Sequence, residues 1–594
     1  MISTRALRKP SRSKVPRFVA GALVALALPL LGGCEALLDR DVPPDDPQEV
    51  YWPEDQIRPE VSGLHGAVAA GHPLAAQAGY EVLRAGGTAA DAAVTMAAVL
   101  AVVRPHMNGV GGDAFALFYE AETGRVTALN GSGRAAAGAT PELFRERGLD
   151  EMPETGPLAV TVPGAVSAWA AALERHGTFS LAQALEPAIR LADEGFVVTH
   201  TLAEDLADVS DLNEAGQGIY APEGRPIAPG DVLRNPALAR SMRALADQGP
   251  SAIYGGPVGQ ALARFLEAEG SPLRVEDFRA HSADWTEPLT FPFQGRTIHT
   301  LPPNSQGIAV LQTLAIAEAR GLGQDQGLEQ ARGPMDPALL HTLVEAKKLA
   351  FADRDRWVAD PDVSPAPVDR LLDPEYLARR AGEIGPRAAE EVAPGFDDDG
   401  TGTGQTDGDG DTVYLIAVDA DGNAVSWIQS LFHSFGSGLV DPETGIVLQN
   451  RGGGFTLEEG HPNQIGPEKR PFHTLMATLV TDQAGTFEMA LGTPGGHGQS
   501  QTVAQALVQM LIFGMGPQHA TEAPRYRSYD GLTLAVESRM APLVLRELEV
   551  RGHELRVVEG WTAPFGNLHV IRREASGALR TGADMRREGA AAAY

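Results

Sequence analysis

The residues best placed to carry chemistry are Asp411 and Thr412, which stand where a polar stretch meets an apolar one. Residues 397–410 are mainly Asp, Gly and Thr, whereas residues 413–418 are almost entirely apolar or aromatic. If the chain is cut before such a threonine, the freed α-amine can serve as the base for the hydroxyl of the same residue. The pattern is therefore compatible with an N-terminal nucleophile, but a threonine that merely opens a strand would give the same pattern.

Two kinds of element would have to position this chemistry. The β-branched and aromatic content of residues 412–418 and 424–428, with turn residues between them, predicts a core hairpin that begins at Thr412. A second predicted strand, residues 487–491, leads into the glycine-rich residues 492–496. Attack on a carbonyl develops an oxyanion, and backbone N–H groups of such a loop can stabilise it. An ordinary glycine turn would have the same composition.

The N-terminal third predicts a layered pattern of strands and helices. Residues 61–71 are typical of a short strand, and His72 and Pro73 begin a helix that runs to Arg84. Thr88 can cap a second, alanine-rich helix over residues 89–103. Residues 116–119 and 126–129 alternate as a hairpin. The glycines of residues 108–115 lack the strand-and-helix context of a nucleotide fingerprint, so we predict no nucleotide site there.

Composition narrows the class of protein. The 594 residues carry a net charge of −29, which disfavours nucleic acid as a partner. No linker divides residues 61–594 into separate cores, so we expect one large α/β unit with a pliable loop at residues 397–411.

The first 60 residues predict export and anchoring. Six Lys and Arg residues precede the uncharged apolar run 18–31, which has the layout of a secretory signal over residues 1–33. The run ends in Leu-Gly-Gly-Cys at Cys34, the one cysteine of the chain, and this resembles a bacterial lipobox. We expect Cys34 to carry a lipid anchor, residues 34–60 to form an acidic, proline-rich tether, and the protein to lie in the bacterial cell envelope, outside the cytoplasm.

No metal or cofactor is predicted. Residues 407–411 resemble the start of a calcium loop, but the sixth and twelfth positions hold Thr412 and Val418 instead of Gly and Glu. His341 and Glu345 are four residues apart on a predicted helix, yet the HExxH order is absent and the sequence offers no third ligand. A packing role is expected for both.

Six phrases, in order, resemble the gamma-glutamyltransferase family over residues 61–594. They are AGGTAADAAV, RPHMNGVGGDAF, GPLAVTVPGAVSAW, HGTFSLAQALEPAIRLADEGF, HTLVEAKKLAFADRDRWVADP and GTPGGHGQ. The resemblance implies an α/β (α+β layered) fold with four αββα layers. It also implies self-cleavage between Asp411 and Thr412, giving a large chain (61–411) and a small catalytic chain (412–594). It further implies that Ser430 orients the nucleophile and that Gly495 and Gly496 form the oxyanion hole.

The substrate pocket departs from the family pattern. Ser132 stands where glutathione-cleaving members hold an Arg, and Phe432 where they hold an Asn. Arg451 and Gly454 replace polar and acidic residues, and His473-Thr474 replaces a pair of serines. This variant is similar to the subgroup with oxamate amidohydrolase-like and acylase-like members. Arg134, Arg451, His473 and Thr474 are the candidate substrate contacts, with a purely structural ion pair as the alternative for Arg451.

The resemblance implies a self-processing enzyme that cleaves a γ-glutamyl or related small acidic amide through an acyl-enzyme, with water or an amino acid as acceptor. An amidohydrolase for oxamate-like or glutaryl-like amides is the alternative. A non-catalytic envelope binding protein is a third reading, against which the joint presence of Thr412, Ser430 and the two glycines argues. Losing the γ-glutamyl contacts predicts weak turnover of glutathione.

Overall fold

The computed structural model describes residues 51–53, 56–323, 331–396 and 410–594. The chain divides into the units Met1–Asp46 and Pro47–Tyr594, and the described residues all belong to the second. The predicted signal, Cys34, most of the predicted tether and residues 397–409 of the predicted processing loop lie outside the described residues. Within those residues, the helices fall short of the length and apolar character that a membrane crossing requires.

Two antiparallel sheets of seven strands each form the centre of the second unit. The sheet that contains the predicted hairpin has the order β19-β2-β10-β11-β3-β4-β7, with strands Ala590–Ala593, Ala67–Ala70, Asp411–Val418, Ala424–Phe432, Asp113–Glu120, Arg125–Gly131 and Asp284–Thr286. The other has the order β1-β18-β17-β13-β12-β9-β8, with strands Val61–Gly63, Leu579–Ala583, His569–Arg573, Phe487–Gly492, Thr478–Thr481, Arg296–Thr300 and Leu289–Phe293.

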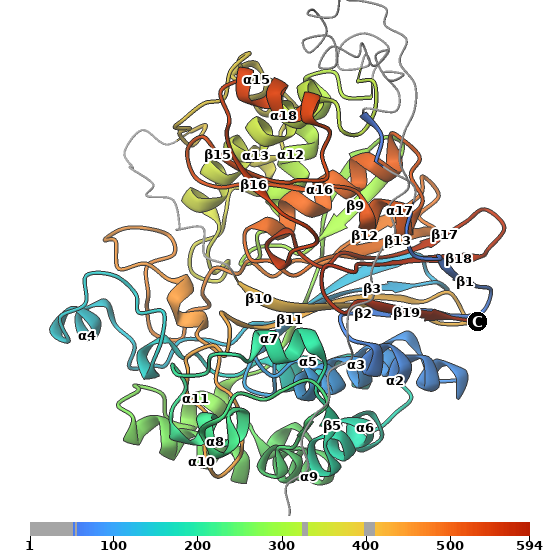
Figure 1. Ribbon diagram of the computed structural model, residues 1–594. Coiled ribbons are helices and arrows are strands. Elements are labelled where there is room, and N and C mark those ends of the chain that lie inside the picture. Colours follow the sequence, from blue (N-terminus) through green and yellow to red (C-terminus); the bar gives the residue numbers. More distant parts are fainter. Residues whose placement is uncertain (1–50, 54–55, 324–330, 397–409) are drawn as a thin grey trace, which may run out of the picture. The chain divides into compact units, whose positions relative to one another are not determined.

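Helices cover the outer face of each sheet (Figure 1). The hairpin sheet packs on α2 (Pro73–Arg84), α3 (Ala89–Val103), α5 (Ala165–His176), α6 (Leu181–Glu194) and α9 (Pro236–Gln248) through one apolar cluster. The second sheet packs on α12 (Ile308–Ala319), α13 (Pro337–Trp357) and α16 (Gly498–Leu511) through another. A third cluster, which includes Tyr414, Ile416 and Ala490, lies between the sheets. The four-layer αββα prediction is therefore confirmed.

Smaller elements complete the unit. Beside the helical layers lie α4 (Pro141–Glu146), α7 (His200–Asp205), α8 (Glu214–Tyr220), α10 (Pro257–Ala268), α11 (Val275–Ala280), α14 (Val368–Leu371), α15 (Pro374–Gly382), α17 (Pro517–Glu522) and α18 (Pro542–Val550). The short strands are β5 (Phe196–Val197), β6 (Val232–Leu233), β14 (Tyr526–Ser528), β15 (Thr533–Glu537) and β16 (Glu554–Val558).

Local sequence signals account for the predicted helix starts. The His72 side chain accepts a hydrogen bond from the Leu74 amide ahead of Pro73, and this caps α2. Thr88 and Asp91 form a reciprocal capping box at the start of α3. Each cap satisfies amide groups that the first helical turn leaves without partners. Both predicted helices and both predicted hairpins are confirmed, although residues 61–71 form two strands, β1 and β2, instead of one.

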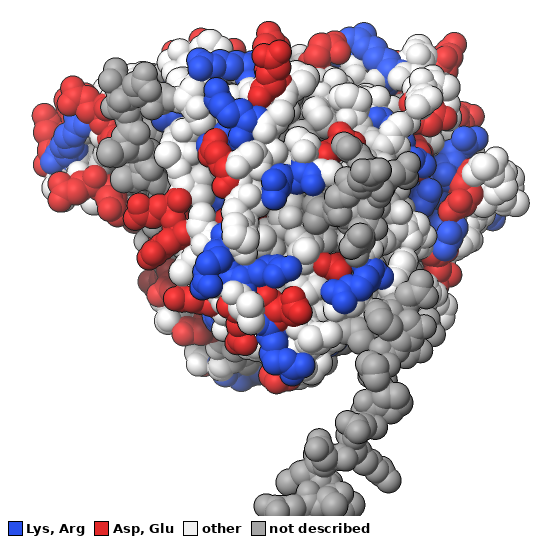
Figure 2. Space-filling view, turned by 90° about the horizontal axis from the view of Figure 1, so that it is seen from above, with Lys and Arg blue, Asp and Glu red and all other residues white. Residues whose placement is uncertain are grey.

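The folded unit begins earlier than the sequence predicts. Tyr51 is buried and its carbonyl accepts a hydrogen bond from the Met335 amide, while the amides of Ile57 and Arg58 donate to Glu522. The predicted end of the tether at residue 60 is therefore too late. On the face seen in Figure 2, basic and acidic side chains are interspersed.

Candidate active site

Thr412 and Ser430 lie directly opposite each other on β10 and β11, and both are buried. The Thr412 hydroxyl donates to Ser430 Oγ at 3.1 Å, and Ser430 Oγ donates to the Asp411 carbonyl at 2.7 Å. A β-bulge falls between Asp411 and Thr412, so the peptide bond predicted to be cut is the point at which the ladder is irregular. One hydroxyl thus contacts both the candidate nucleophile and the carbonyl that it would attack.

Phe432 fixes Ser430 from the other side. Its amide donates to Ser430 Oγ at 2.7 Å, and its backbone adopts a φ of +85°, which is unusual for an aromatic residue. Such a conformation costs on the order of 1–3 kcal/mol and persists only where surrounding contacts impose it. The Arg451 guanidinium packs over the Phe432 ring at 4.3 Å from its centroid.

The predicted oxyanion loop requires its glycines. Gly495 has a φ of +123° and Gly496 a φ of +54°, conformations that a side chain would strain. In the described part of the chain, neither amide donates to an acceptor. A Cβ on Gly410 would lie 3.1 Å from Gly496 Cα, so Gly410 packs directly against this loop. The glycine loop therefore lies beside Gly410 and Asp411, the residues just before the candidate nucleophile.

The Arg451 guanidinium is a buried cation to which the described residues offer no hydrogen-bond acceptor. Arg451 lies in the short helix Arg451–Gly454, only 1% exposed, and none of its three guanidinium nitrogens has an acceptor in the described structure. Burial lowers its pKa to about 10, an effect that the charge of Asp113 partly offsets. A desolvated guanidinium with free donors is a strong site for a carboxylate, which can accept two parallel N–H bonds from it.

Asp113, at the start of β3, is a site residue that the sequence analysis missed. Its Oδ1 accepts the amides of Gly133 and Gly164, and its Oδ2 has no hydrogen-bond donor in the described structure. Burial raises its pKa to about 7, against the opposing effect of Arg451. An ionisable residue between glycines and a buried strand was the available signal, because such a position needs a reason to tolerate charge.

His473 lies close to both Asp113 and Ser132. His473 Nε2 lies 2.8 Å from Ser132 Oγ and 3.6 Å from Asp113 Oδ2. Burial, with the charges of Arg451 and Arg470, holds the pKa of His473 well below its usual range. His473 is therefore neutral, and it would contact an anion by hydrogen bonding and not by charge.

Two predicted substrate contacts are engaged elsewhere. Arg134 donates to Asp362 and Asp360 and to the Glu468 carbonyl, so its guanidinium is committed to ion pairs outside the group just described. Thr474 is buried next to His473, and its carbonyl accepts from the Gln306 side chain, which also bonds the Gly496 carbonyl. Thr474 thus supports the oxyanion loop through Gln306.

Arg587, near the C-terminus, holds the residue before the predicted cut. Its guanidinium donates to Asp411 Oδ1 at 3.1 Å and lies 3.5 Å from Asp205. A cavity of about 90 Å³ opens here, lined by Gly410, Asp411, Gly495, Arg527 and Arg587 among others. The cavity therefore lies beside Asp411, the residue before the predicted cut, and beside Gly495 of the predicted oxyanion loop.

Comparison with known proteins agrees with this geometry. Residues 75–594 match the family described as Gamma-glutamyltranspeptidase. The chain is 38% identical to the glutathione hydrolase-like YwrD proenzyme of Bacillus subtilis, over 89% of this chain and 99% of that protein. It is 36% identical to the oxamate amidohydrolase proenzyme of Klebsiella pneumoniae, over 89% and 98%. The structure of cephalosporin acylase from Bacillus halodurans aligns with a TM-score of 0.83 and 35% identity, covering 91% of this chain and 98% of that one.

Proposed function

The chain belongs to the gamma-glutamyltranspeptidase family, and from that premise we propose that it is a self-processing amidohydrolase whose preferred acyl group is a small acid bearing a carboxylate. The observation that carries this proposal is the buried guanidinium of Arg451, which has no acceptor among the described residues. A buried charge without a hydrogen-bond acceptor is costly. Its retention against Phe432, whose amide donates to the Ser430 hydroxyl, is best explained by an anionic ligand.

Processing would use the contacts of the uncut chain. Thr412 Oγ1 attacks the Asp411 carbonyl, whose oxygen already accepts the Ser430 hydroxyl, and the resulting ester is hydrolysed. Cleavage frees the Thr412 α-amine, with an ordinary pKa near ~7.7–8.0, to act as base in later turnovers.

Turnover on a substrate would repeat the same chemistry. The Thr412 hydroxyl attacks the amide carbonyl, and the amides of Gly495 and Gly496 stabilise the oxyanion. The amine leaves with a proton from the α-ammonium, and water then hydrolyses the acyl-enzyme. Arg451 would hold the carboxylate of the acyl group, with Ser132 and neutral His473 as hydrogen-bonding neighbours. The name of one relative, an oxamate amidohydrolase, supports an acyl group that lacks an α-amine.

A γ-glutamyl substrate is the second candidate, and Asp113 favours it. The free Oδ2 of Asp113 could accept a hydrogen bond from an α-ammonium group, and that cation would lower the raised pKa of the carboxyl. Arg451 would then bind the α-carboxylate of the same substrate. The relative described as glutathione hydrolase-like is consistent with this candidate.

The test compares matched amides with one enzyme preparation. We expect a larger kcat/KM for des-amino glutathione, oxamate or a glutaryl anilide than for glutathione or γ-glutamyl anilide. Asp113→Asn should leave kcat/KM nearly unchanged for the amides whose acyl group lacks an α-amine. A clear preference for glutathione that Asp113→Asn abolishes would establish the γ-glutamyl candidate instead. Failure to cleave any of these amides, in a preparation shown to be processed, would refute both.

A further inference from the structure

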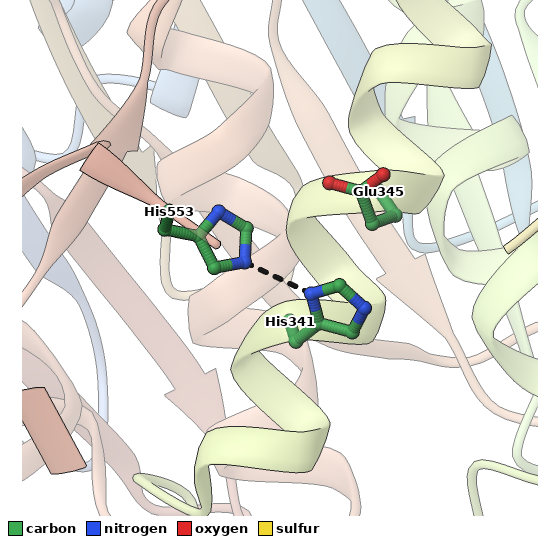
Figure 3. A group of neighbouring side chains, drawn as sticks. All are labelled: His341, Glu345 and His553. Atoms are coloured by element: carbon green, nitrogen blue, oxygen red, sulfur yellow. Dashed lines mark hydrogen bonds between the residues drawn. The ribbon is translucent and has the colours of Figure 1, made fainter. Parts of the chain in front are cut away.

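A third potential ligand lies beside His341 and Glu345, where the sequence offered none. His341 and Glu345 occupy one face of α13, and His553 follows α18 just before β16. Figure 3 shows the two imidazole rings pointing toward each other, with the Glu345 carboxylate one turn along the helix. All three residues are buried, and one ligand atom from each lies within 4.8 Å of the others.

The hydrogen bond of His341 to Gly385 fixes its tautomer, so that the lone pair of Nδ1 is directed at His553. Its Nε2 lies 3.0 Å from the Gly385 carbonyl, which can only accept, so Nε2 carries the proton and Nδ1 carries a lone pair. A ligating histidine characteristically donates its other N–H to such a carbonyl. Nδ1 lies 2.9 Å from His553 Nε2. Ligands at about 2.0–2.1 Å in a tetrahedral site lie about 3.3 Å apart, so a few tenths of an ångström of movement would suffice.

His553 and Glu345 can each present a ligand atom at this position. Because His341 Nδ1 can only accept, His553 Nε2 donates to it, and His553 Nδ1, which has no partner in the described structure, can take that proton when Nε2 binds an ion. Glu345 Oε1 faces the Lys348 ammonium at 2.8 Å. Glu345 Oε2 accepts the Ala389 amide at 3.0 Å, which fixes the carboxylate.

Nearby cations oppose metal binding. Lys348 Nζ lies 2.8 Å from Glu345 Oε1, and the charge of Arg551 also reaches both histidines. Lys348 has a second partner, the Ala389 carbonyl at 2.7 Å, which it can keep if a metal ion takes Oε1. Arg551 lies 3.9 Å from Glu547, which offsets part of its charge. Lys348 is therefore a competitor whose removal should strengthen binding.

We propose that His341, Glu345 and His553 form a site for a divalent metal ion of the zinc class. His341 and Glu345 precede the Asp411–Thr412 bond and His553 follows it, so the ion would join the two chains that processing creates. Two imidazoles and one carboxylate suit Zn²⁺, whereas Ca²⁺ and Mg²⁺ prefer oxygen ligands alone. The role is structural, and it is independent of the substrate proposal.

The experiment is a Zn²⁺ titration of the metal-stripped, full-length protein in excess Ca²⁺, which occupies acidic surface sites. Equilibrium dialysis with elemental analysis gives the stoichiometry, and thermal unfolding gives a second readout because an ion that binds the folded state raises Tm. We expect His553→Gln to lose one equivalent of Zn²⁺. Lys348→Met removes the cation that competes for Glu345 Oε1, so it should increase the affinity for that Zn²⁺ ion by about tenfold or more, which corresponds to about 1.4 kcal/mol.

His200→Gln is the matched control. His200 and Glu204 form a pair with the same spacing, 3.2 Å apart, but both are exposed. This variant should keep the full Zn²⁺ stoichiometry. Equal stoichiometry in His553→Gln and wild type, or no Zn²⁺ bound by wild type, would show that the two histidines are only a structural pair. If His553→Gln fails to fold, Lys348→Met decides, because an unchanged affinity there overturns the proposal.

Discussion

Replacing Arg451 with methionine should make the protein more stable and less active. Burial lowers the pKa of Arg451 from 12.5 to about 10, so keeping the charge in the folded state costs on the order of 3 kcal/mol. Losing the contact between Arg451 and the Phe432 ring destabilises the variant by about 1 kcal/mol, which offsets part of this gain. We therefore expect Arg451→Met to gain about 2 kcal/mol, which for the roughly 550 residues of this unit raises Tm by about 2 °C.

The kinetic effect should depend on the charge of the substrate. Truncating one partner of a buried charge pair costs about 2–5 kcal/mol, so kcat/KM on a carboxylate-bearing amide should fall by about 30-fold to several thousand-fold. An amide of similar size with a neutral acyl group should be affected little. Thermal unfolding at pH 7 and initial rates on the two substrates measure both consequences in one preparation.

Arg586→Met is the control for a buried arginine that is fully paired. Arg586 donates to both oxygens of Glu537 and to Asp584, and its side chain has no exposed surface. Breaking such a pair should destabilise the protein by about 3–5 kcal/mol. If Arg451→Met also lowers Tm, and reduces activity on charged and neutral substrates alike, Arg451 is a structural charge and the anion-site reasoning is refuted.

Three further predictions concern processing, pH and location. Thr412→Ala should remain one uncut, inactive chain on a denaturing gel, and Ser430→Ala should process about 10²–10³-fold more slowly because it loses the hydroxyl on the scissile carbonyl; two bands from Thr412→Ala would exclude this nucleophile. Burial raises the pKa of Asp113 to about 7, so between pH 4 and 7 the folded protein keeps a proton that the unfolded chain releases. The stability gained from this proton is full below pH about 4 and is lost as the pH rises through 7. Relative to Asp113→Asn, the wild type should thus lose on the order of 4 kcal/mol of stability between pH 4 and 8, and parallel Tm curves would contradict this. Cys34→Ser should release the protein from the membrane fraction or leave the signal uncut, and unchanged fractionation would remove the case for an anchor.

Much of the fold could be predicted because its signals are local. Thr88 is followed by Asp91 and an alanine-rich stretch, which specify a capped helix whatever the rest of the chain does. The apolar run after Thr412 specifies a buried strand, and the start of that run places Thr412 at the beginning of the strand. Chain order and residue type thus determined the strands, the helices, the candidate nucleophile and the candidate oxyanion glycines.

The surroundings of the charged side chains were decided only by tertiary structure. Arg134 and Arg451 look equally able to bind an anion in the sequence. Packing places Asp360 and Asp362 against Arg134, whereas no described residue supplies an acceptor to the Arg451 guanidinium. His553 reaches His341 across more than 200 positions of sequence. The physical reason is that the pKa and binding capacity of a buried group depend on desolvation and on partners brought from distant segments. Sequence spacing carries no information about either.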